Sequence, residues 1–285
     1  MGPMRPRRGT CLRTEHPESK SVQSSFVTVQ GRRLEYRRIA AARPSAPTLV
    51  FLHEGLGSVS LWRDFPDKVA QATGCGTVVY SRYGYGRSDV LEAPHKVDYM
   101  HREAGEVLPE LLDKLGILDP LLVGHSDGAS IALIYTAAHP GMRGLIVEAP
   151  HVFVEDVSVK SIAAAKEMFE TSDLPARLAR HHADPAKTFY GWNDIWLHPD
   201  FRAWNIESCL PQIACPLLAI QGLDDEYGTL RQLAAIESRV KGTVRIVKLN
   251  DCGHSPHRDQ PDATLAAMVG FIREVVPEAI QAASQ

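Results

Sequence analysis

The residues with the clearest capacity for chemistry lie in the segment Gly124-His-Ser-Asp-Gly128. Residues 121–123, an apolar run without alternation, precede this G-x-S-x-G pattern and predict a strand that is buried on both faces. An apolar helix is expected to follow and to end at His139-Pro-Gly141. At such a sharp strand-to-helix turn the hydroxyl of Ser126 is forced outward, and free helix amides point at negative charge forming beside it. The segment therefore predicts a nucleophile or, on the simpler interpretation, a helix start capped by Ser126 or Asp127.

Two later segments place a carboxylate and a histidine after predicted strands. Residues 216–220 form an apolar run that leads to Asp225, and residues 244–249 lead to His254. Ligands of open parallel sheets bind beyond the carboxyl ends of the strands, so the loops that follow the strands share one edge. We therefore expect a serine, an acid and a histidine at that edge.

The elements that must position these residues alternate between strands and helices. This β-α-β alternation predicts the α/β fold class, with a mostly parallel sheet and helices on both faces. An edge hairpin around Gly31 opens the sheet. The predicted elements are strands at 26–30, 33–37, 48–52, 77–80, 121–123, 145–147, 216–220 and 244–249, and helices around 62–69, at 99–115 and from Pro261 onward. Three unusual loops, 53–58, 82–89 and 124–128, fall at the same edge.

The strand rhythm disappears from residue 154 to about residue 212. Short helices rich in aromatic residues are predicted there, at 158–169, 174–181 and 185–196. The aromatic side chains are either the core of a small helical subdomain or part of a lid, with Trp192 or Trp196 facing a substrate pocket. The expected organisation is a disordered tail at 1–24, a core at 25–153 and 213–285, and a helical cap at 154–212.

Composition narrows the partners and the compartment. The 285 residues are 44% hydrophobic and 23% charged, and the net charge of −3 gives no electrostatic case for nucleic acid or an anionic membrane surface. No apolar run approaches the length of a membrane span. The five cysteines, Cys11, Cys75, Cys209, Cys215 and Cys252, form no metal-type pair and favour a reducing compartment. We expect a cytoplasmic protein with a small-molecule substrate, no metal, and no nucleic-acid or membrane partner; a homo-oligomer stays open.

Taken together, these motifs resemble the α/β-hydrolase superfamily, in particular its capped serine hydrolases and esterases. The family's order is a serine, then an acid after the penultimate strand, then a histidine after the last strand. The resemblance extends from residue 26 to the final helix and implies the α/β-hydrolase fold. It rests on the elbow segment and on His53-Glu-Gly-Leu-Gly-Ser58, Gly84-Tyr-Gly-Arg-Ser-Asp89, Gly222-Leu-Asp-Asp225, Gly253-His-Ser-Pro256 and Pro261.

The resemblance also implies roles in acyl transfer. His254 takes the proton of Ser126 during attack and gives it to the leaving group, while Asp225 orients the imidazole and stabilises its charged form. Asp224 is an alternative acid. His257 is an alternative base, although the glycine and proline around His254 match the family's pattern better.

The oxyanion of the tetrahedral intermediate needs preorganised donors. The backbone N–H groups of Gly55 and Asp127 stand at the family's positions. The family usually has glycine directly after the loop histidine, and here Glu54 intervenes, so the amide of Leu56 is an alternative to that of Gly55.

Glu54 and Asp127 add carboxylates near the nucleophile. They are either bound by neighbouring amides or arginines, such as Arg82 or Arg87, or they select a substrate that is cationic or rich in hydrogen-bond donors. The residues expected to line the substrate pocket are Glu54, Leu56, Trp192 and Trp196.

We therefore predict a serine hydrolase that cleaves a small or medium carboxylic ester, lactone or thioester through an acyl-enzyme, without a cofactor. A serine at the elbow argues against the superfamily's dehalogenases and epoxide hydrolases, which use a carboxylate nucleophile. The same three residues are also compatible with carbon–carbon cleavage of a ring-fission diketone or with opening of an enol-lactone. Acyl transfer to an alcohol, or a receptor that uses the pocket for sensing, are the remaining alternatives.

Overall fold

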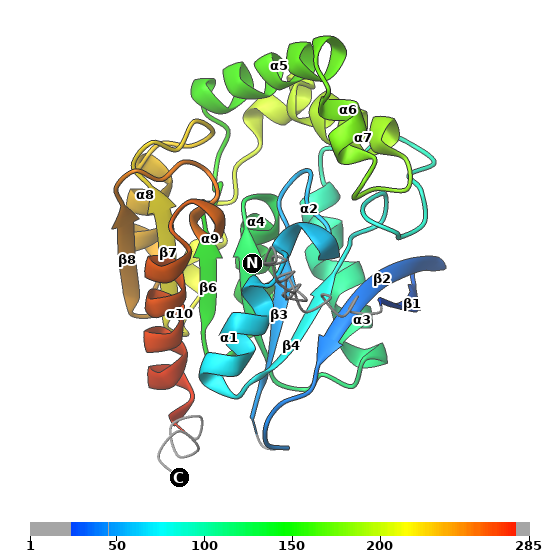
Figure 1. Cartoon of the computed structure of the whole chain (residues 1–285). Helices are drawn as coiled ribbons and strands as arrows, with labels where there is room; N and C mark the ends of the chain where they lie inside the picture. The colour runs from blue at the N-terminus through cyan, green and yellow to red at the C-terminus, as the bar shows by residue number, and fades with distance from the viewer. Residues whose placement is uncertain (1–23, 45, 278–285) are drawn as a thin grey trace, which may run out of the picture.

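One eight-stranded sheet forms the centre of the molecule, in a computed structural model that describes residues 24–44 and 46–277 (Figure 1). The strands are β1 (Ser25–Val29), β2 (Arg32–Ile39), β3 (Thr48–Leu52), β4 (Gly76–Tyr80), β5 (Pro120–His125), β6 (Leu145–Glu148), β7 (Leu217–Gly222) and β8 (Val244–Leu249). Their order across the sheet is β1-β2-β4-β3-β5-β6-β7-β8. β2 is antiparallel to both β1 and β4, and every pair from β4 through β3 to β8 is parallel. The predicted α/β class is confirmed.

Helices cover both faces of this sheet (Figure 1). They are α1 (Phe65–Thr73), α2 (Tyr99–Arg102), α3 (Leu108–Lys114), α4 (Asp127–Ala138), α5 (Asp156–Thr171), α6 (Leu174–Leu178), α7 (Pro185–Trp196), α8 (Arg231–Arg239), α9 (Pro256–Asp259) and α10 (Pro261–Val275). Val69 of α1 and Phe271 of α10 share an apolar cluster with Phe51 of β3. Leu111 of α3 joins a second cluster with Val50. Because neighbouring residues of a strand point to opposite faces, these are the two cores on either side of the sheet.

Two of the strand predictions were accurate to the residue. The strands predicted at 48–52 and 244–249 have the bounds of β3 and β8. β3, β4 and β5 are almost entirely buried, as central strands of a parallel sheet should be. β8 is the exception, since it lies at the sheet edge and is mostly half-buried or exposed.

The single helix predicted at 99–115 was wrong in detail, because a π-helical turn at Glu103–Val107 separates α2 from α3. Gly105 lies in this turn and lowers the local preference for a regular α-helix. The turn places Glu103 inside the protein, at 9% exposure. Two other boundaries also moved: α1 begins at Phe65 after a 3₁₀ turn, and α6 ends at Leu178 rather than at residue 181.

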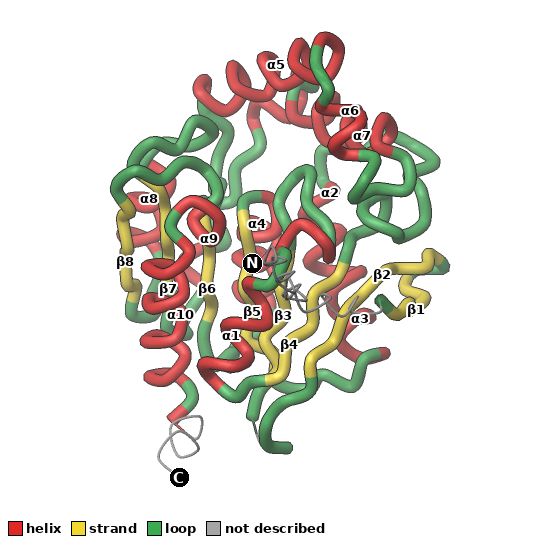
Figure 2. Tube along the Cα trace, in the orientation of Figure 1, coloured by secondary structure: helices red, strands yellow, loops and turns green. Residues whose placement is uncertain are grey.

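Helices α5, α6 and α7 stand together above the carboxyl ends of the strands (Figures 1 and 2). An isolated antiparallel bridge between Phe153 and Asn205 joins the two ends of this segment. Its aromatic residues pack largely on one another: the rings of Phe169 and Phe189 stack at 4.0 Å, and Phe201 contacts Trp196 at 5.1 Å. The predicted division into core and cap stays a prediction.

Of the tail predicted at 1–24, only Ser24 is among the described residues, and its hydroxyl donates to Glu35. In the described part of the chain, no helix has both the length and the apolar character needed to cross a bilayer.

Candidate active site

A strained turn between β5 and α4 presents the hydroxyl of Ser126. Ser126 has φ 53°, in the left-handed region that side chains other than glycine rarely adopt. The two flanking glycines are required by close packing. A Cβ at Gly124 would collide with the carbonyl oxygen of Gly128, and one at Gly128 would collide with that of Leu52. The bond from the Ser126 amide to the Glu148 carbonyl, at 2.9 Å, fixes the turn against β6.

Ser126, His254 and Asp225 form a continuous hydrogen-bonded chain. Oγ of Ser126 lies 2.9 Å from Nε2 of His254, and Nδ1 of His254 lies 2.8 Å from Oδ1 of Asp225. The three residues follow β5, β8 and β7, so the parallel sheet brings together positions that are far apart in sequence. A carboxylate only accepts hydrogen bonds, so Nδ1 of His254 carries a proton and Nε2 is free to accept the serine proton.

The side chain of Asp225 is buried, and several hydrogen-bond donors surround it. Its Oδ1 accepts bonds from the amides of Tyr227 and Gly228, and its Oδ2 accepts one from the side chain of Gln221. Burial alone would raise the pKa of this carboxyl, but the charge and hydrogen bond of His254 and the Tyr227 amide outweigh burial and lower the pKa to about 2. Asp225 therefore stays ionised and can stabilise a positive imidazole.

The two rival residues occupy other positions. Asp224 is exposed, and it is Asp225 that contacts His254. His257 instead bonds Glu148, both through its amide and through Nδ1 at 2.8 Å. The residues hydrogen-bonded in series to Ser126 are therefore His254 and Asp225, and not His257 or Asp224.

Three backbone amides are available near the serine. In the described part of the chain, the N–H groups of Gly55, Leu56 and Asp127 have no hydrogen-bond partner, whereas Gly57 uses its amide to close a turn onto the Glu54 carbonyl. The amide of Asp127 is at the first position of α4, where the helix dipole adds to its pull on an anion. Either Gly55 or Leu56 could therefore supply a second N–H donor beside that of Asp127.

The side chain of Asp127 is fully engaged. It accepts hydrogen bonds from the Tyr99 hydroxyl at 2.7 Å and from Nε1 of Trp196 at 3.2 Å, and it lies 3.6 Å from the guanidinium of Arg82. Asp127 and Arg82 are each 1% exposed. Of the two arginines considered from sequence, Arg82 is therefore the partner, and Arg87 is not among these contacts. This carboxylate is structural and does not face the pocket as a free charge.

Glu54 is paired with a histidine instead of an arginine. Its Oε2 lies 3.6 Å from Nδ1 of His125, while Nε2 of His125 donates to the carbonyl of His254 at 2.6 Å. Burial opposes the charged form of His125, but the Glu54 carboxylate overcomes it and raises the pKa to about 8. His125 in turn outweighs the burial of Glu54 and holds the pKa of that carboxyl well below its usual range. Near neutral pH this is an ion pair beneath the His254 loop.

A cavity of about 180 Å³ opens onto Ser126 and His254. The four residues expected around the pocket, Glu54, Leu56, Trp192 and Trp196, all line it. Lining residues that the sequence did not indicate are His151, Ile162, Glu226, Tyr227 and Ser255. His151 had a usable signal, because it follows β6 at the same edge of the sheet as the other strand-end residues.

His151 is the most unusual of these additional residues. It is 3% exposed, and its Nδ1 is sealed from solvent without a hydrogen-bond partner among the described residues. Burial, together with the charge of His254, lowers the pKa of His151 to about 3. The imidazole is therefore neutral, and the residue forms part of the wall of the cavity. Among the residues described, no group of three or more histidine, cysteine or acidic side chains is arranged to hold a metal ion.

Comparison with known proteins places this arrangement in a family. Residues 49–267 match the sequence model described as "Alpha/beta hydrolase family". The chain belongs to the alpha/beta hydrolase family. Membership makes it one of a family of hydrolase enzymes, and the matched region contains Ser126, Asp225 and His254.

Relatives within the alpha/beta hydrolase family carry several different names. Epoxide hydrolase 4 of Mus musculus is 21% identical over an alignment of 291 positions, gaps included, which covers 87% of this chain and 79% of that protein. The 2-succinyl-6-hydroxy-2,4-cyclohexadiene-1-carboxylate synthase of Enterobacter sp. (strain 638) is 24% identical over 264 residues, covering 82% of this chain and 94% of that protein. The enol-lactonase structure from Burkholderia xenovorans LB400 superposes with a TM-score of 0.69 at 21% identity, covering 87% of this alpha/beta hydrolase and 99% of that chain. These similarities support the fold, but they do not identify the substrate, which must be inferred from the residues of the site.

Proposed function

We propose that this protein is a serine hydrolase that cleaves a small or medium carboxylic ester, lactone or thioester through an acyl-enzyme, without a cofactor. The observation that carries the proposal is the continuous chain from Ser126 through His254 to Asp225, with separations of 2.9 Å and 2.8 Å, at the wall of a cavity. Nucleophile, base and orienting acid are the three parts that acyl transfer by a serine requires.

In the proposed reaction, His254 removes the proton of Ser126 as the hydroxyl attacks the substrate carbonyl. The oxyanion that forms is held by the amide of Asp127 and by that of Gly55, with Leu56 as the alternative. His254 then protonates the leaving group, and water attacks the acyl-enzyme by the same route. Such amide donors are each worth about 3 kcal/mol in the transition state.

The cavity favours a compact substrate without a negative charge. Its volume is about 180 Å³, and its walls include the indoles of Trp192 and Trp196. None of the described lining residues is a lysine or arginine, whereas Glu226 and the paired Glu54 are acidic. An anionic acyl group would therefore meet repulsion without a compensating partner. In this proposal helices α5 to α7 act as a cap that shields the acyl-enzyme.

Serine rather than aspartate at position 126 is the reason that we do not propose epoxide opening through a carboxylate ester.

The cysteines Cys75, Cys209, Cys215 and Cys252 are all free, which supports the proposal of a reducing, cytoplasmic setting.

The decisive experiment compares the wild type with Ser126→Ala on p-nitrophenyl acetate and butyrate. We expect turnover to fall to background while the circular dichroism spectrum stays unchanged. Ser238→Ala, on the exposed side of α8, is the matched control and should keep full activity. A fluorophosphonate should label Ser126 in the wild type and the control; ester turnover retained by Ser126→Ala would refute the mechanism.

A substrate panel then separates reactions that use the same residues. It should contain simple esters, thioesters, an enol-lactone and a ring-fission diketone. We expect the esters, thioesters or lactone to give the highest kcat/KM. Exclusive turnover of the diketone would replace ester hydrolysis with carbon–carbon cleavage as the function.

A further inference from the structure

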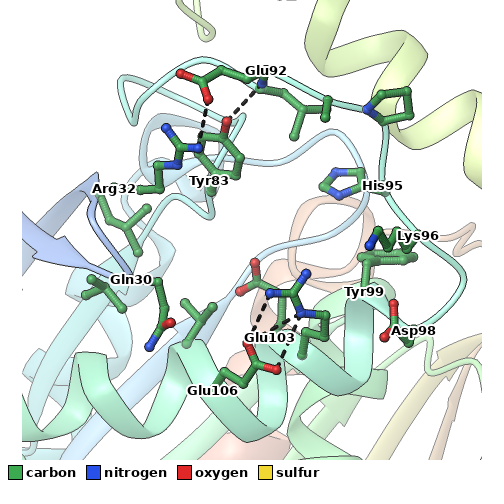
Figure 3. A pocket seen from close by; sticks show the side chains of 17 residues that line it. Gln30, Arg32, Tyr83, Glu92, His95, Lys96, Asp98, Tyr99, Glu103 and Glu106 are labelled. Atoms are coloured by element: carbon green, nitrogen blue, oxygen red, sulfur yellow. Dashed lines mark hydrogen bonds and ion pairs between the residues drawn. The ribbon is translucent and has the colours of Figure 1, made fainter.

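A second cavity, of about 390 Å³, has Tyr99 among its lining residues. It is lined by the β1–β2 hairpin, Tyr83, the loop 91–96, helix α2 and the π-helical turn. In Figure 3, Glu103 and Glu106 stand on the helical segment, with Arg32 and Tyr83 across the cavity and His95 on the loop above. The cavity contains none of the residues proposed for hydrolysis.

Two residues of this cavity, His95 and Glu103, each have a buried polar atom without a hydrogen-bond partner among the described residues, and Glu103 is the acidic one. The residue is 9% exposed, and its Oε2 is sealed from solvent with no hydrogen bond to any described residue. Burial raises the pKa of Glu103 to about 7, against the opposing charges of Arg82 and Arg102. A buried carboxylate without a partner is costly, so the site favours whatever supplies positive charge there.

The charges around Glu103 do not balance. Deeper in the protein, Arg82 is already paired with Asp127 at 3.6 Å. At the cavity rim, Arg102 is exposed and paired with Glu106 at 3.1 Å, so its charge is shared. The buried group therefore holds two carboxylates and one guanidinium. One additional positive charge, either a proton or a bound cation, would make this group neutral.

Other charged residues at the rim leave this imbalance in place. Arg32 pairs with Glu92 at 2.7 Å, and Lys96 and Asp98 are exposed. In the described part of the chain Lys96 forms no ion pair, so it does not neutralise Glu103 in this structure. Burial and Arg82 lower the pKa of His95 to about 4, so that ring is neutral as well.

Other parts of the cavity wall are aromatic and apolar, and they suit the hydrocarbon part of a ligand. The rings of His95 and Tyr99 stack at 5.0 Å and form one wall. Leu34 and Val107 supply apolar surface on the opposite elements. Aromatic faces attract cations as well as apolar groups.

We propose that this cavity binds a small organic ammonium ion, whose charged nitrogen pairs with the Glu103 carboxylate and whose apolar body packs against Tyr99, His95 and Leu34. The site is separate from the proposed hydrolytic one, so it can be tested on the Ser126→Ala protein as well as on the wild type. Binding replaces the proton of Glu103, and the affinity therefore rises as the pH increases through neutrality.

The test uses the full chain and benzylammonium as the probe, with benzyl alcohol as the neutral match, by isothermal titration or ligand-observed NMR. Near pH 8 we expect saturable binding of benzylammonium at least about tenfold tighter than that of benzyl alcohol, as a charge-assisted bond provides. Near pH 6 this preference should shrink, because Glu103 is then largely protonated.

Glu103→Gln should weaken benzylammonium by about tenfold or more and leave benzyl alcohol nearly unchanged. Glu106→Gln, one turn away at the rim, is the matched control and should change the ammonium affinity by less than about threefold. Equal affinities of the two probes for the wild type would overturn the proposal without any variant. So would an ammonium affinity that survives Glu103→Gln or falls equally in both variants.

Discussion

The hydroxyl of Tyr99 donates a 2.7 Å hydrogen bond to the carboxylate of Asp127, the residue directly after Ser126. The same carboxylate accepts a bond from Trp196 of α7 and lies beside Arg82 of the loop after β4. One buried side chain therefore connects the serine turn to three other segments. It also explains how the turn keeps a strained backbone, because its neighbour is held on several sides.

Tyr99→Phe removes one donor and leaves the buried Asp127 oxygen with weaker support. We expect the free energy of unfolding to fall by about 1–3 kcal/mol in urea titrations, the cost of an unsatisfied buried group. Tyr190→Phe is the control, because Tyr190 contributes ring contacts with Phe169 and Phe189. Equal stabilities for the two variants would show that the Tyr99 bond is not important.

Asp225→Asn should leave the fold intact and lower kcat for an activated ester by about three to four orders of magnitude. The physical reason is that an amide cannot balance the charge of His254 and can favour the wrong tautomer of its ring. Asp224→Asn, at the exposed neighbouring position, should keep kcat within about twofold of the wild type. The reverse ranking of these two variants would move the acid to Asp224.

Gly55→Ala tests the loop that is proposed to hold the oxyanion. A Cβ at this position would collide with Nε1 of Trp192, so the loop or the indole must shift. We expect kcat/KM for p-nitrophenyl esters to fall by about a hundredfold or more, as for loss of an oxyanion donor. Gly270→Ala in α10, where a Cβ meets nothing within 4 Å, should leave the kinetics unchanged. Unaltered activity in Gly55→Ala would argue against this placement of the loop.

The stability of Glu103→Gln should depend on pH differently from that of the wild type. The folded state raises the pKa of Glu103 from 4.5 to about 7, so it binds the proton more tightly than the unfolded chain. Wild-type stability from this group is therefore lost as the pH rises through that window. Between about pH 5 and pH 8, the difference in unfolding free energy should move by about 2–3 kcal/mol in favour of the variant. A difference that stays constant with pH would place Glu103 in water.

Elements of the fold could be predicted where a short stretch of sequence was enough to specify the local structure. Residues 49–52 are all apolar and favour a buried strand, and Gly124 and Gly128 mark a turn that packing requires. The 99–115 segment failed because its hydrophobic spacing survives a π turn, and because Glu103 looks like a residue of a solvent-exposed face. Burial of a glutamate depends on the hairpin and loop that cover it, which local sequence does not specify.

Part of the candidate site was also within reach. Strand order and loop position predicted that a serine, an acid and a histidine approach one another, and the resemblance to α/β hydrolases was needed to choose Asp225 and His254 over their neighbours. The roles of these residues stay predictions until variants are assayed. The partners of the two extra carboxylates were harder, because they depend on side-chain packing: Arg82 was one of two options, and the contact of Glu54 with His125 was not foreseen. His151 was missed although it follows a strand at the same edge.

The left-handed backbone at Ser126 lowers the stability of the fold at the position that supplies the reactive hydroxyl. A residue with a side chain in that conformation costs the fold roughly 1–2 kcal/mol that glycine would not. A glycine there would make a sturdier protein with no hydroxyl at the cavity wall. Searches for heat-resistant variants that score only survival should therefore drift toward inert molecules at this position, and such a search needs a reactivity screen alongside it.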